Sequence, residues 1–367
     1  PEHGRLYDHT QMQGVVHVSP DGQTAKGRWR ALVFGGNEGG ISVFGDCIYE
    51  NEYRKEDGVW KLSKLHSYFI MYTNWDQGWA KLGWPNTRPE EELPPDRPPT
   101  VVYDMYPGEL TAPMHYENPV TGGPVFAEAA GAAAAQPPAG ATDPSVGAEP
   151  SGDRRASAPP APIDIRAGLE SLRRRIGLLE DAKAVERLHN VYGYYLDDRR
   201  WDELADLFAD DGTLEMGQRG VYAGKARVRA SLDLLGPAGP RDGLIESHYQ
   251  YQPVVHVAPD GQSAELRARE FVLSGEHGGA AYVGGSVYEN EYVKEDGVWK
   301  IASSHPYTTF LADYTRGWSH GALPMPGPSD ALPPDRPPSV EYEAFPAFNL
   351  LPPFHYDHPV TGRPIAR

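Results

Sequence analysis

Cysteine is nearly absent from this chain of 367 residues, which contains only Cys47. A single cysteine excludes an internal disulfide framework and a zinc site built on cysteines. Long apolar runs are also absent: no stretch of about 18 hydrophobic residues occurs, so we expect no membrane-spanning helix. Basic residues are scarce, with 34 Lys and Arg against 51 Asp and Glu and a net charge of −17. An acidic surface repels phosphate backbones, which argues against nucleic-acid binding.

The chain does have the length and the material for a core. Hydrophobic residues make up 40% of the sequence and aromatic residues 11%. A chain of 367 residues suits about two domains. Because it begins at Pro1 rather than Met, the sequence says nothing about a signal peptide. With no membrane span expected, we expect a cytoplasmic protein.

The sequence repeats itself once. The string QGVVHVSPDGQTA at residues 13–25 returns as QPVVHVAPDGQSA at residues 252–264. Residues 48–61 match residues 287–300 at all but two positions. A repeat of this length indicates the tandem duplication of a whole domain rather than a stack of short units.

The repeat divides the chain into three predicted segments. Residues 1–125 form a partial repeat, which holds the sheet half of the domain and a Pro-rich tail. Residues 126–162 are rich in Ala, Pro, Gly and Ser, and we expect a disordered linker because such a composition buries little apolar surface. Residues 163–367 form the complete repeat. Its tail is rich in Pro and aromatic residues, and we expect it to wrap the domain or to cross to the other repeat.

Within the complete repeat, a helical period gives way to a strand period. Apolar residues recur at spacings of three and four over residues 166–198, and shorter helices are predicted over 202–210 and from Gly224. After Pro240 the period becomes two, in four strand-like runs of which the last is VWKIASSHPYTTF. Helices followed by an antiparallel meander predict an α+β domain, with the helices packed on one face of a curved sheet.

Four strings carry a resemblance to a known family: YGYYLD, WDELADLFADDGTLE, HYQYQPVVHVAPDG and YENEYVKEDGVWKI. They resemble the SnoaL-like branch of the NTF2-like superfamily, over about residues 180–320 and, in the first repeat, about residues 9–80. The resemblance implies a cone in which three helices close one end of a bent sheet around an apolar pocket. Its members include polyketide cyclases, ketosteroid isomerases, scytalone dehydratase and non-catalytic transport factors, so the fold alone does not fix the function.

Strand periodicity selects candidate site residues. Alternate residues of a strand share a face, which groups His248 with Gln250 and Gln252. The same rule groups Ser286 with Tyr288 and Asn290 on another strand. Three further candidates lie on the first helix and one after the last strand: Asp197, Tyr192, Tyr195 and His305.

Similarity to scytalone dehydratase supports part of this set. Its helix aspartate corresponds to Asp197, and its first strand histidine corresponds to His248. Its second histidine falls only near His277. Its Ser-x-Asn pair corresponds to Ser286-x-Tyr288, which keeps the serine and loses the asparagine. These departures argue against the same dehydration and leave acid–base chemistry in the same pocket open.

We predict that His248 and Asp197 form the proton-transfer pair and that the Tyr288 hydroxyl stabilises a developing oxyanion. No cofactor is expected, because the chain has no Gly-rich phosphate loop. No metal is expected, because the histidine spacing does not suit one. The remaining six candidates would contact the substrate: Tyr192, Tyr195, Gln250, Ser286, Asn290 and His305.

This set predicts a cofactor-independent lyase, dehydratase or isomerase that transfers protons on a small apolar, in particular aromatic, molecule. The alternative is a non-catalytic module for ligand binding or scaffolding, in which the same side chains only pack. Epoxide hydrolysis ranks lower, because its Asp–Arg–Asp arrangement has no match on the predicted strands. We expect the repeats to pair through their sheets as a pseudo-dimer within the chain, and leave a further homodimer open. Only the second repeat contains every part of the predicted site.

Overall fold

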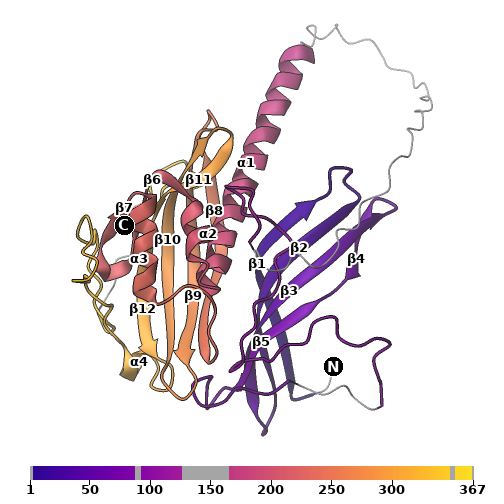
Figure 1. The fold of residues 1–367 in the computed structure, drawn as a ribbon. Coiled ribbons are helices and arrows are strands. Elements are labelled where there is room, and N and C mark those ends of the chain that lie inside the picture. The colour runs from indigo at the N-terminus through magenta and orange to yellow at the C-terminus, as the bar shows by residue number, and fades with distance from the viewer. Residues whose placement is uncertain (1–2, 87–91, 126–164, 348–351, 366–367) are drawn as a thin grey trace.

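The computed structural model describes residues 3–86, 92–125, 165–347 and 352–365. They form two curved sheets that lie side by side, with one long helix at the seam between them (Figure 1). Both sheets are antiparallel apart from one parallel strand pair in the second. The predicted linker, residues 126–162, lies outside the described residues. No described helix is long and apolar enough to cross a membrane.

The first repeat contributes a five-stranded sheet. Its strands follow one another as hairpins, and the fifth returns to pair with the third. Asp57 has a φ of 53° and Gly58 a φ of 77°, which is the left-handed conformation that a tight hairpin requires. The strands are β1 (Arg5–Val18), β2 (Thr24–Asn37), β3 (Ser42–Glu56), β4 (Val59–Lys64) and β5 (Ser67–Asn74).

The second repeat contributes helices and a seven-stranded sheet in the order β7-β6-β11-β10-β9-β8, with β12 also paired to β10. The predicted α+β cone, with helices on one face of a curved sheet, is confirmed. The elements before the meander are α1 (Ile165–Asp197), α2 (Trp201–Asp206), β6 (Phe208–Glu215), η1 (Gly217–Arg219), β7 (Val221–Ala223), α3 (Lys225–Leu232) and η2 (Asp233–Leu235). The remaining ones are β8 (Leu244–Val257), β9 (Ser263–Glu276), β10 (Ala281–Glu295), β11 (Val298–Ser304), β12 (Pro306–Asp313) and α4 (Trp318–Gly321).

Two predicted elements differ from the observed ones. The helix expected over residues 202–210 ends at Asp206, and Phe208 already begins a strand. The last strand-like run is two strands rather than one, because the chain breaks at His305 before Pro306, which has no N–H to donate. Both halves pair with the long strand β10, at opposite ends of it.

A bulge interrupts the same place in both repeats. The register of β1 shifts between Met12 and Val15, and that of β8 between Tyr251 and Val254. Gln13 and Gln252 take positive φ values of 58° and 55° there. The bulge turns Gln252 outward into solvent, so the face predicted for His248, Gln250 and Gln252 ends at Gln250.

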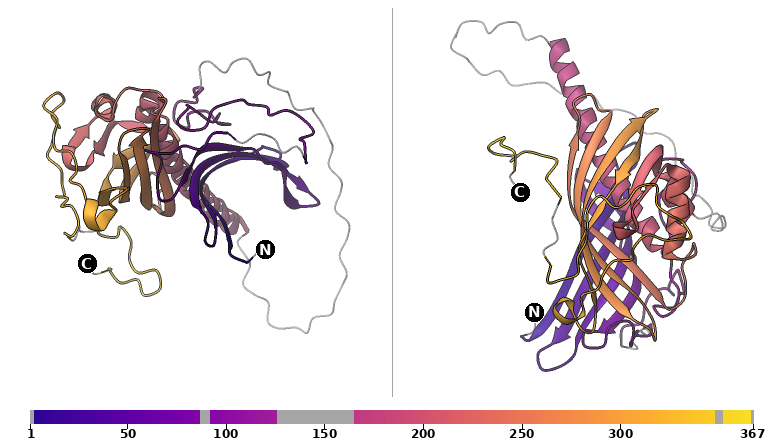
Figure 2. Two further views of the ribbon diagram at one scale, coloured as in Figure 1. Left: turned by 90° about the horizontal axis from the view of Figure 1, so that it is seen from below. Right: turned by 90° about the vertical axis from the view of Figure 1, so that its left-hand side faces the viewer.

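The two sheets lie next to each other (Figure 2). They pack through an aromatic cluster to which both repeats contribute, with Trp79 and Tyr249 fully buried. The indole N–H of Trp79 donates to the carbonyl of Ser274 in the other repeat at 3.0 Å. Helix α1 packs on β8 of its own repeat and on β1 of the first. At this junction the Tyr194 hydroxyl donates to the carbonyl of Gln13 at 2.8 Å.

The tails after both sheets pack rather than hang free. In the second repeat, Asp335 pairs with Arg227, and the Tyr342 hydroxyl accepts the Leu311 N–H. The first tail crosses to the second repeat, where the Asn118 amide donates to the carbonyl of Glu203 at 3.0 Å.

Candidate active site

A cavity of about 360 Å³ lies between the helices of the second repeat and the concave face of its sheet. Most of its wall is aliphatic or aromatic, contributed by α1, α3, β9, β10, β12 and the start of the tail. Its polar lining includes one histidine, three carboxylates and one arginine, besides several hydroxyl groups: His248, Glu246, Glu270, Glu215 and Arg219. A cavity of this size and lining suits a small, largely apolar molecule.

His248 and Asp197 form a hydrogen-bonded pair at the edge of the cavity. Asp197 is the last residue of α1, and its Oδ1 accepts both the backbone N–H of His248 at 2.7 Å and the ring Nδ1 at 2.8 Å. A carboxylate can only accept, so Nδ1 carries a proton. The other ring nitrogen, Nε2, has no hydrogen-bond partner among the described residues, and the side chain borders the cavity.

The charge on His248 follows from its surroundings. Burial lowers the pKa of the imidazole, but the Asp197 hydrogen bond and the charges of Glu270, Asp197 and Glu246 outweigh burial and raise it to about 9. At neutral pH His248 is therefore an imidazolium that can donate a proton from Nε2.

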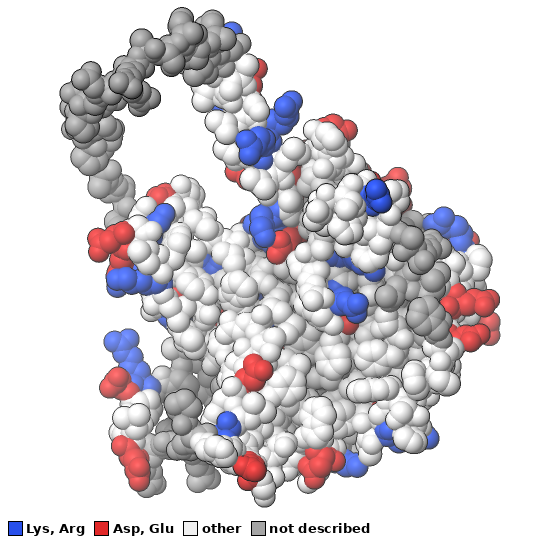
Figure 3. All heavy atoms as spheres, turned by 180° about the vertical axis from the view of Figure 1, so that it is seen from behind, with Lys and Arg blue, Asp and Glu red and all other residues white. Residues whose placement is uncertain are grey.

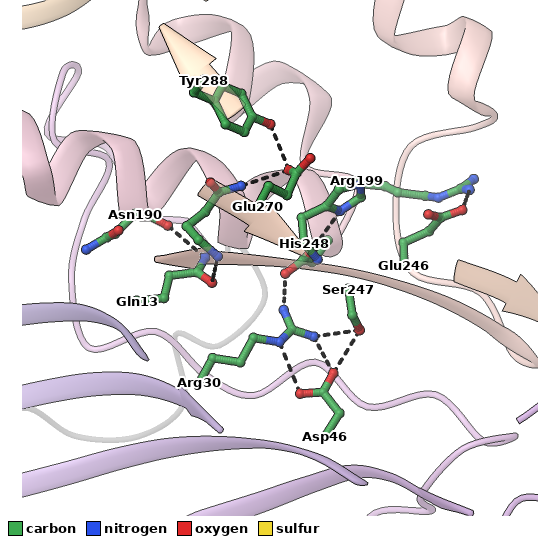
Figure 4. Close-up of polar contacts among 12 residues, drawn as sticks. Gln13, Arg30, Asp46, Asn190, Arg199, Glu246, Ser247, His248, Glu270 and Tyr288 are labelled. Carbon is green, nitrogen blue, oxygen red and sulfur yellow. Dashed lines mark hydrogen bonds and ion pairs between the residues drawn. The ribbon is translucent and has the colours of Figure 1, made fainter. Parts of the chain in front are cut away.

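Glu270 lies on the same cavity wall and is nearly completely buried. Its Oε1 accepts the Tyr288 hydroxyl at 2.8 Å and the Gln250 amide at 2.9 Å (Figure 4). Burial and the Glu270 charge raise the pKa of Tyr288 well above its usual value, so the phenol stays protonated. Because both bonds end on Oε1, Oε2 is the oxygen available to take a proton.

His189 of α1 supports this arrangement from behind. Its Nε2 lies 3.0 Å from the Gln250 amide oxygen, and burial lowers its pKa to about 4, so the ring is neutral. Since the Gln250 nitrogen donates to Glu270, its oxygen accepts, and the His189 proton is assigned to Nε2. His189 therefore orients Gln250, and Gln250 in turn holds the carboxylate of Glu270.

The structure brings together five of the nine predicted residues at the cavity: Asp197, through its pairing with His248, then His248 itself, Tyr288, Tyr192 and Ser286. The other four lie outside its lining. Gln250 faces Glu270, and the oxygen of Asn290 accepts the His305 N–H at 2.9 Å. Tyr195 is buried in the core, and its hydroxyl has no hydrogen-bond partner within the described part of the chain. The ring of His305 stacks on Tyr307 and contacts Glu215.

Sequence reasoning missed Glu270 and Glu246. Glu270 occurs in the string RARE, where it looks like one more charged surface residue. Comparison of the repeats carries the signal: Glu270 stands where the first repeat has Ala31, in a strand whose alternate positions Ala268 and Val272 face inward. A glutamate that stands in place of an alanine on an inward-facing position of a strand is expected to be buried, so this comparison points to Glu270.

His277, the approximate match to the second histidine of scytalone dehydratase, lies away from the cavity. It is exposed in the turn between β9 and β10, and its ring meets Tyr106 of the first repeat edge-on. The resemblance suggested His277 as a second histidine of the site, but its side chain does not border the cavity that His248 and Glu270 line.

No cluster of three or more His, Cys, Asp or Glu side chains in the described part of the chain has an arrangement suited to a metal ion. Charged residues of both signs are scattered over the face shown in Figure 3, and much of that face is uncharged.

Comparison with known proteins found several solved structures that are similar to this chain. Solved structures of similar fold include a protein assigned as a scytalone dehydratase from Novosphingobium aromaticivorans, with 22% identity and a TM-score of 0.34, covering 42% of this chain and 97% of that chain. Another is the type 3 hexachlorocyclohexane dehydrochlorinase LinA from Novosphingobium barchaimii, with 19% identity and a TM-score of 0.34, covering 38% and 93%. A third is an NTF2-like protein with a cystatin-like fold from Novosphingobium aromaticivorans, with 22% identity and a TM-score of 0.31, covering 38% and 88%.

Comparison with curated protein sequences gave no match. The sequence profile of the SnoaL-like domain matches residues 1–66 and 178–305, which together make up more than half of the chain. The second matched segment contains all of the strings that carried the resemblance, and the first contains the first-repeat counterparts of the last two. The chain belongs to the SnoaL-like domain family.

Proposed function

We propose that the second repeat is a cofactor-independent lyase, dehydratase or isomerase that acts by proton transfer on a small apolar, aromatic molecule. One observation carries the proposal: an imidazolium, His248, and a buried carboxylate, Glu270, border the same apolar cavity. An acid and a base on one substrate are the minimum that such a reaction requires.

The charge state of His248 suggests which group does what. Because His248 is already protonated at neutral pH, it serves as the general acid, and Glu270 serves as the base. Glu270 Oε2 takes a proton from a substrate carbon, and the electron pair of that C–H bond forms a double bond. In an elimination, the leaving oxygen departs with the His248 proton; in an isomerisation, that proton neutralises the enolate oxygen. The sequence predicted His248 and Asp197 as the proton-transfer pair; in this proposal His248 gives the proton and Glu270, rather than Asp197, accepts one.

Tyr288 also takes a different role from the predicted oxyanion donor. Its hydroxyl donates to Glu270, so together with Gln250 it holds the base in place. The apolar lining of the cavity supports an aromatic substrate. It also keeps water away from His248 and Glu270, which strengthens the interaction of both charges with the reacting atoms. Tyr192 and Ser286 border the same space and would contact the ring.

The test is turnover on a panel of phenolic and polycyclic compounds that carry an acidic C–H bond. His248→Gln and Glu270→Gln should each lower kcat/KM at least about a hundredfold, measured at a temperature at which both variants are fully folded. His277→Gln, an exposed histidine of the same repeat, is the matched control and should retain full activity.

A different outcome would identify a binding module. If the panel compounds bind and raise the Tm but none is converted, and the two variants change only the affinity, the catalytic proposal is wrong. The non-catalytic alternative would then describe the cavity.

A further inference from the structure

We propose that the first repeat supplies a positioning residue to the site of the second repeat: Arg30 holds Asp197 in the orientation that binds His248. The catalytic importance of Arg30 in this inference rests on the proposed function. Its geometry is independent of the reaction catalysed.

Arg30 lies on β2 of the first repeat and is almost completely buried. Its Nε donates to Asp46 Oδ1 at 3.0 Å and its Nη2 to Asp46 Oδ2, a two-pronged pairing within the first repeat. The remaining nitrogen, Nη1, crosses to the second repeat and pairs with Asp197 Oδ2. The Tyr249 ring lies 4.8 Å from the guanidinium. One side chain thus binds carboxylates from both repeats.

Ser247 completes the link from the second repeat. Its hydroxyl accepts from Arg30 Nη2 at 2.7 Å and donates to Asp46 Oδ2 at 2.8 Å. Ser247 immediately precedes His248, and its side chain lies on the opposite face of β8 from Glu270 (Figure 4). The network therefore holds the strand on one face while the site occupies the other.

The two oxygens of Asp197 have separate partners. Oδ1 accepts two hydrogen bonds from His248, and Oδ2 is held by Arg30. A carboxylate held at one oxygen cannot rotate without breaking that bond, so Oδ1 stays directed at the imidazole. Without Arg30, only His248 would orient the group.

The arrangement runs in one direction only. The counterpart of Arg30 in the second repeat is Arg269, which is exposed. The counterpart of Asp46 is Gly285, which cannot form an ion pair. The first repeat has Ala31 where the second has Glu270, so each repeat has lost what the other retains. We infer that the two repeats have different roles: the second contains the site, and the first orients Asp197 through Arg30.

The experiment removes the link without leaving a charge stranded. Arg30→Met alone would leave Asp46 buried without its cation, which is strongly destabilising. The double variant Arg30→Met/Asp46→Leu removes one charge of each sign and fills the space with apolar groups. Its matched control is Arg28→Met/Glu50→Leu, a neighbouring buried pair on the same two strands that does not contact Asp197.

The main readout is the His248 imidazole in the full chain, followed by NMR. The variant removes the cation bound to Asp197 together with Asp46, which contacts neither Asp197 nor His248, so the change in charge alone would raise the pKa of His248. A fall in that pKa therefore reports the lost orientation of Asp197. Glu246 and Glu270, which also act on the ring, are left intact. We expect the pKa of His248 to fall by about one unit and the Nδ1 proton signal to broaden. On any substrate found, kcat should fall about ten- to a hundredfold.

The control variant should leave the pKa of His248 and its Nδ1 proton unchanged, whatever it does to Tm. If the Arg30→Met/Asp46→Leu protein also leaves both unchanged, Arg30 is only structural and the inference is wrong. Should the double variant fail to fold, Arg30→Lys keeps the charge, but its single ammonium group cannot match the fork that spans both carboxylates. It should shift the pKa in the same direction by less. Absence of turnover in every protein would count against the proposed function and leave this NMR result standing.

Discussion

At the scale of single residues, His248 shows how a buried imidazole can remain charged. Burial opposes its charge, and three carboxylates on three elements, Asp197 on α1, Glu246 on β8 and Glu270 on β9, favour it more strongly. His189, about two helix turns before Asp197, has no carboxylate partner among the described residues and is held neutral by the same burial. Two histidines in one core therefore differ in charge because of their neighbours rather than their depth.

The charge on His248 predicts how stability depends on pH. In the folded protein the pKa of His248, about 9, lies above its usual value of 6.5. The stability that its charge contributes is therefore fully present below pH 6.5 and is lost as the pH rises to 9. A shift of this size corresponds to as much as about 3 kcal/mol. In chemical denaturation at pH 6.5 and pH 9, His248→Gln should show a smaller loss of unfolding free energy than the natural chain. The exposed His277→Gln serves as the control, and equal losses in all three proteins would contradict the assignment.

Sequence reasoning identified part of the candidate site and missed Glu270, the proposed base. Asp197 and His248 could be predicted from the sequence. The end of the predicted helix placed Asp197 at the pocket, and the strand periodicity placed His248 on its wall. Glu270 was not, because a single glutamate between Arg269 and Phe271 carries no local sign of burial. The hydrogen bonds that give Glu270 its place come from Gln250 and Tyr288, which are distant in sequence and meet only in the folded sheet.

At the scale of elements, α1 is held against both sheets at one close approach. A Cβ at Gly193 would lie 2.5 Å from Gln13 Nε2 and 2.8 Å from Gln250 Cγ, residues of β1 and β8. Gln13 cannot simply move aside, because its amide donates to the carbonyl of Asn190 at 3.1 Å and its oxygen accepts the Gln250 N–H at 3.2 Å. The glycine is therefore what allows the helix to reach the seam.

This contact reverses the usual effect of a substitution. Alanine in place of helical glycine ordinarily stabilises by about 1 kcal/mol, and Gly177→Ala should do so because nothing lies within 4 Å of a Cβ there. Gly193→Ala should instead lower the unfolding free energy by about 1 kcal/mol or more, because overpacking outweighs the gain in helix propensity. Urea denaturation of the two variants measures both signs, and a stabilised Gly193→Ala would show that the seam can relax.

Sequence periodicity found α1 and the long strands, and it failed where tertiary contacts decide. The run from Val298 to Phe310 alternates like one strand, yet it splits at His305 because the curved β10 pairs with two partners in succession. Phe208 continues the apolar spacing of a helix but enters a strand that pairs with β11. In both cases the deciding neighbour lies far along the chain.

At the scale of the whole molecule, the two repeats share buried contacts and should unfold together. Trp79 of the first repeat is fully buried in an aromatic cluster that includes residues of the second. Hydrogen exchange in rising denaturant should give the same opening free energy for peptides from β2 and β9. Loss of protection in β2 well before β9 would show that the first repeat opens on its own. Trp79→Ala should lower both free energies by similar amounts.

The covalent link between the repeats has a consequence for how the site responds to dilution. In a homodimer, an arginine contributed across the interface would be lost when the subunits dissociate at low concentration. Here Arg30 and Asp197 belong to one polypeptide, so their encounter is intramolecular and has a fixed effective concentration. A nanomolar solution of this protein should hold Asp197 as firmly as a millimolar one.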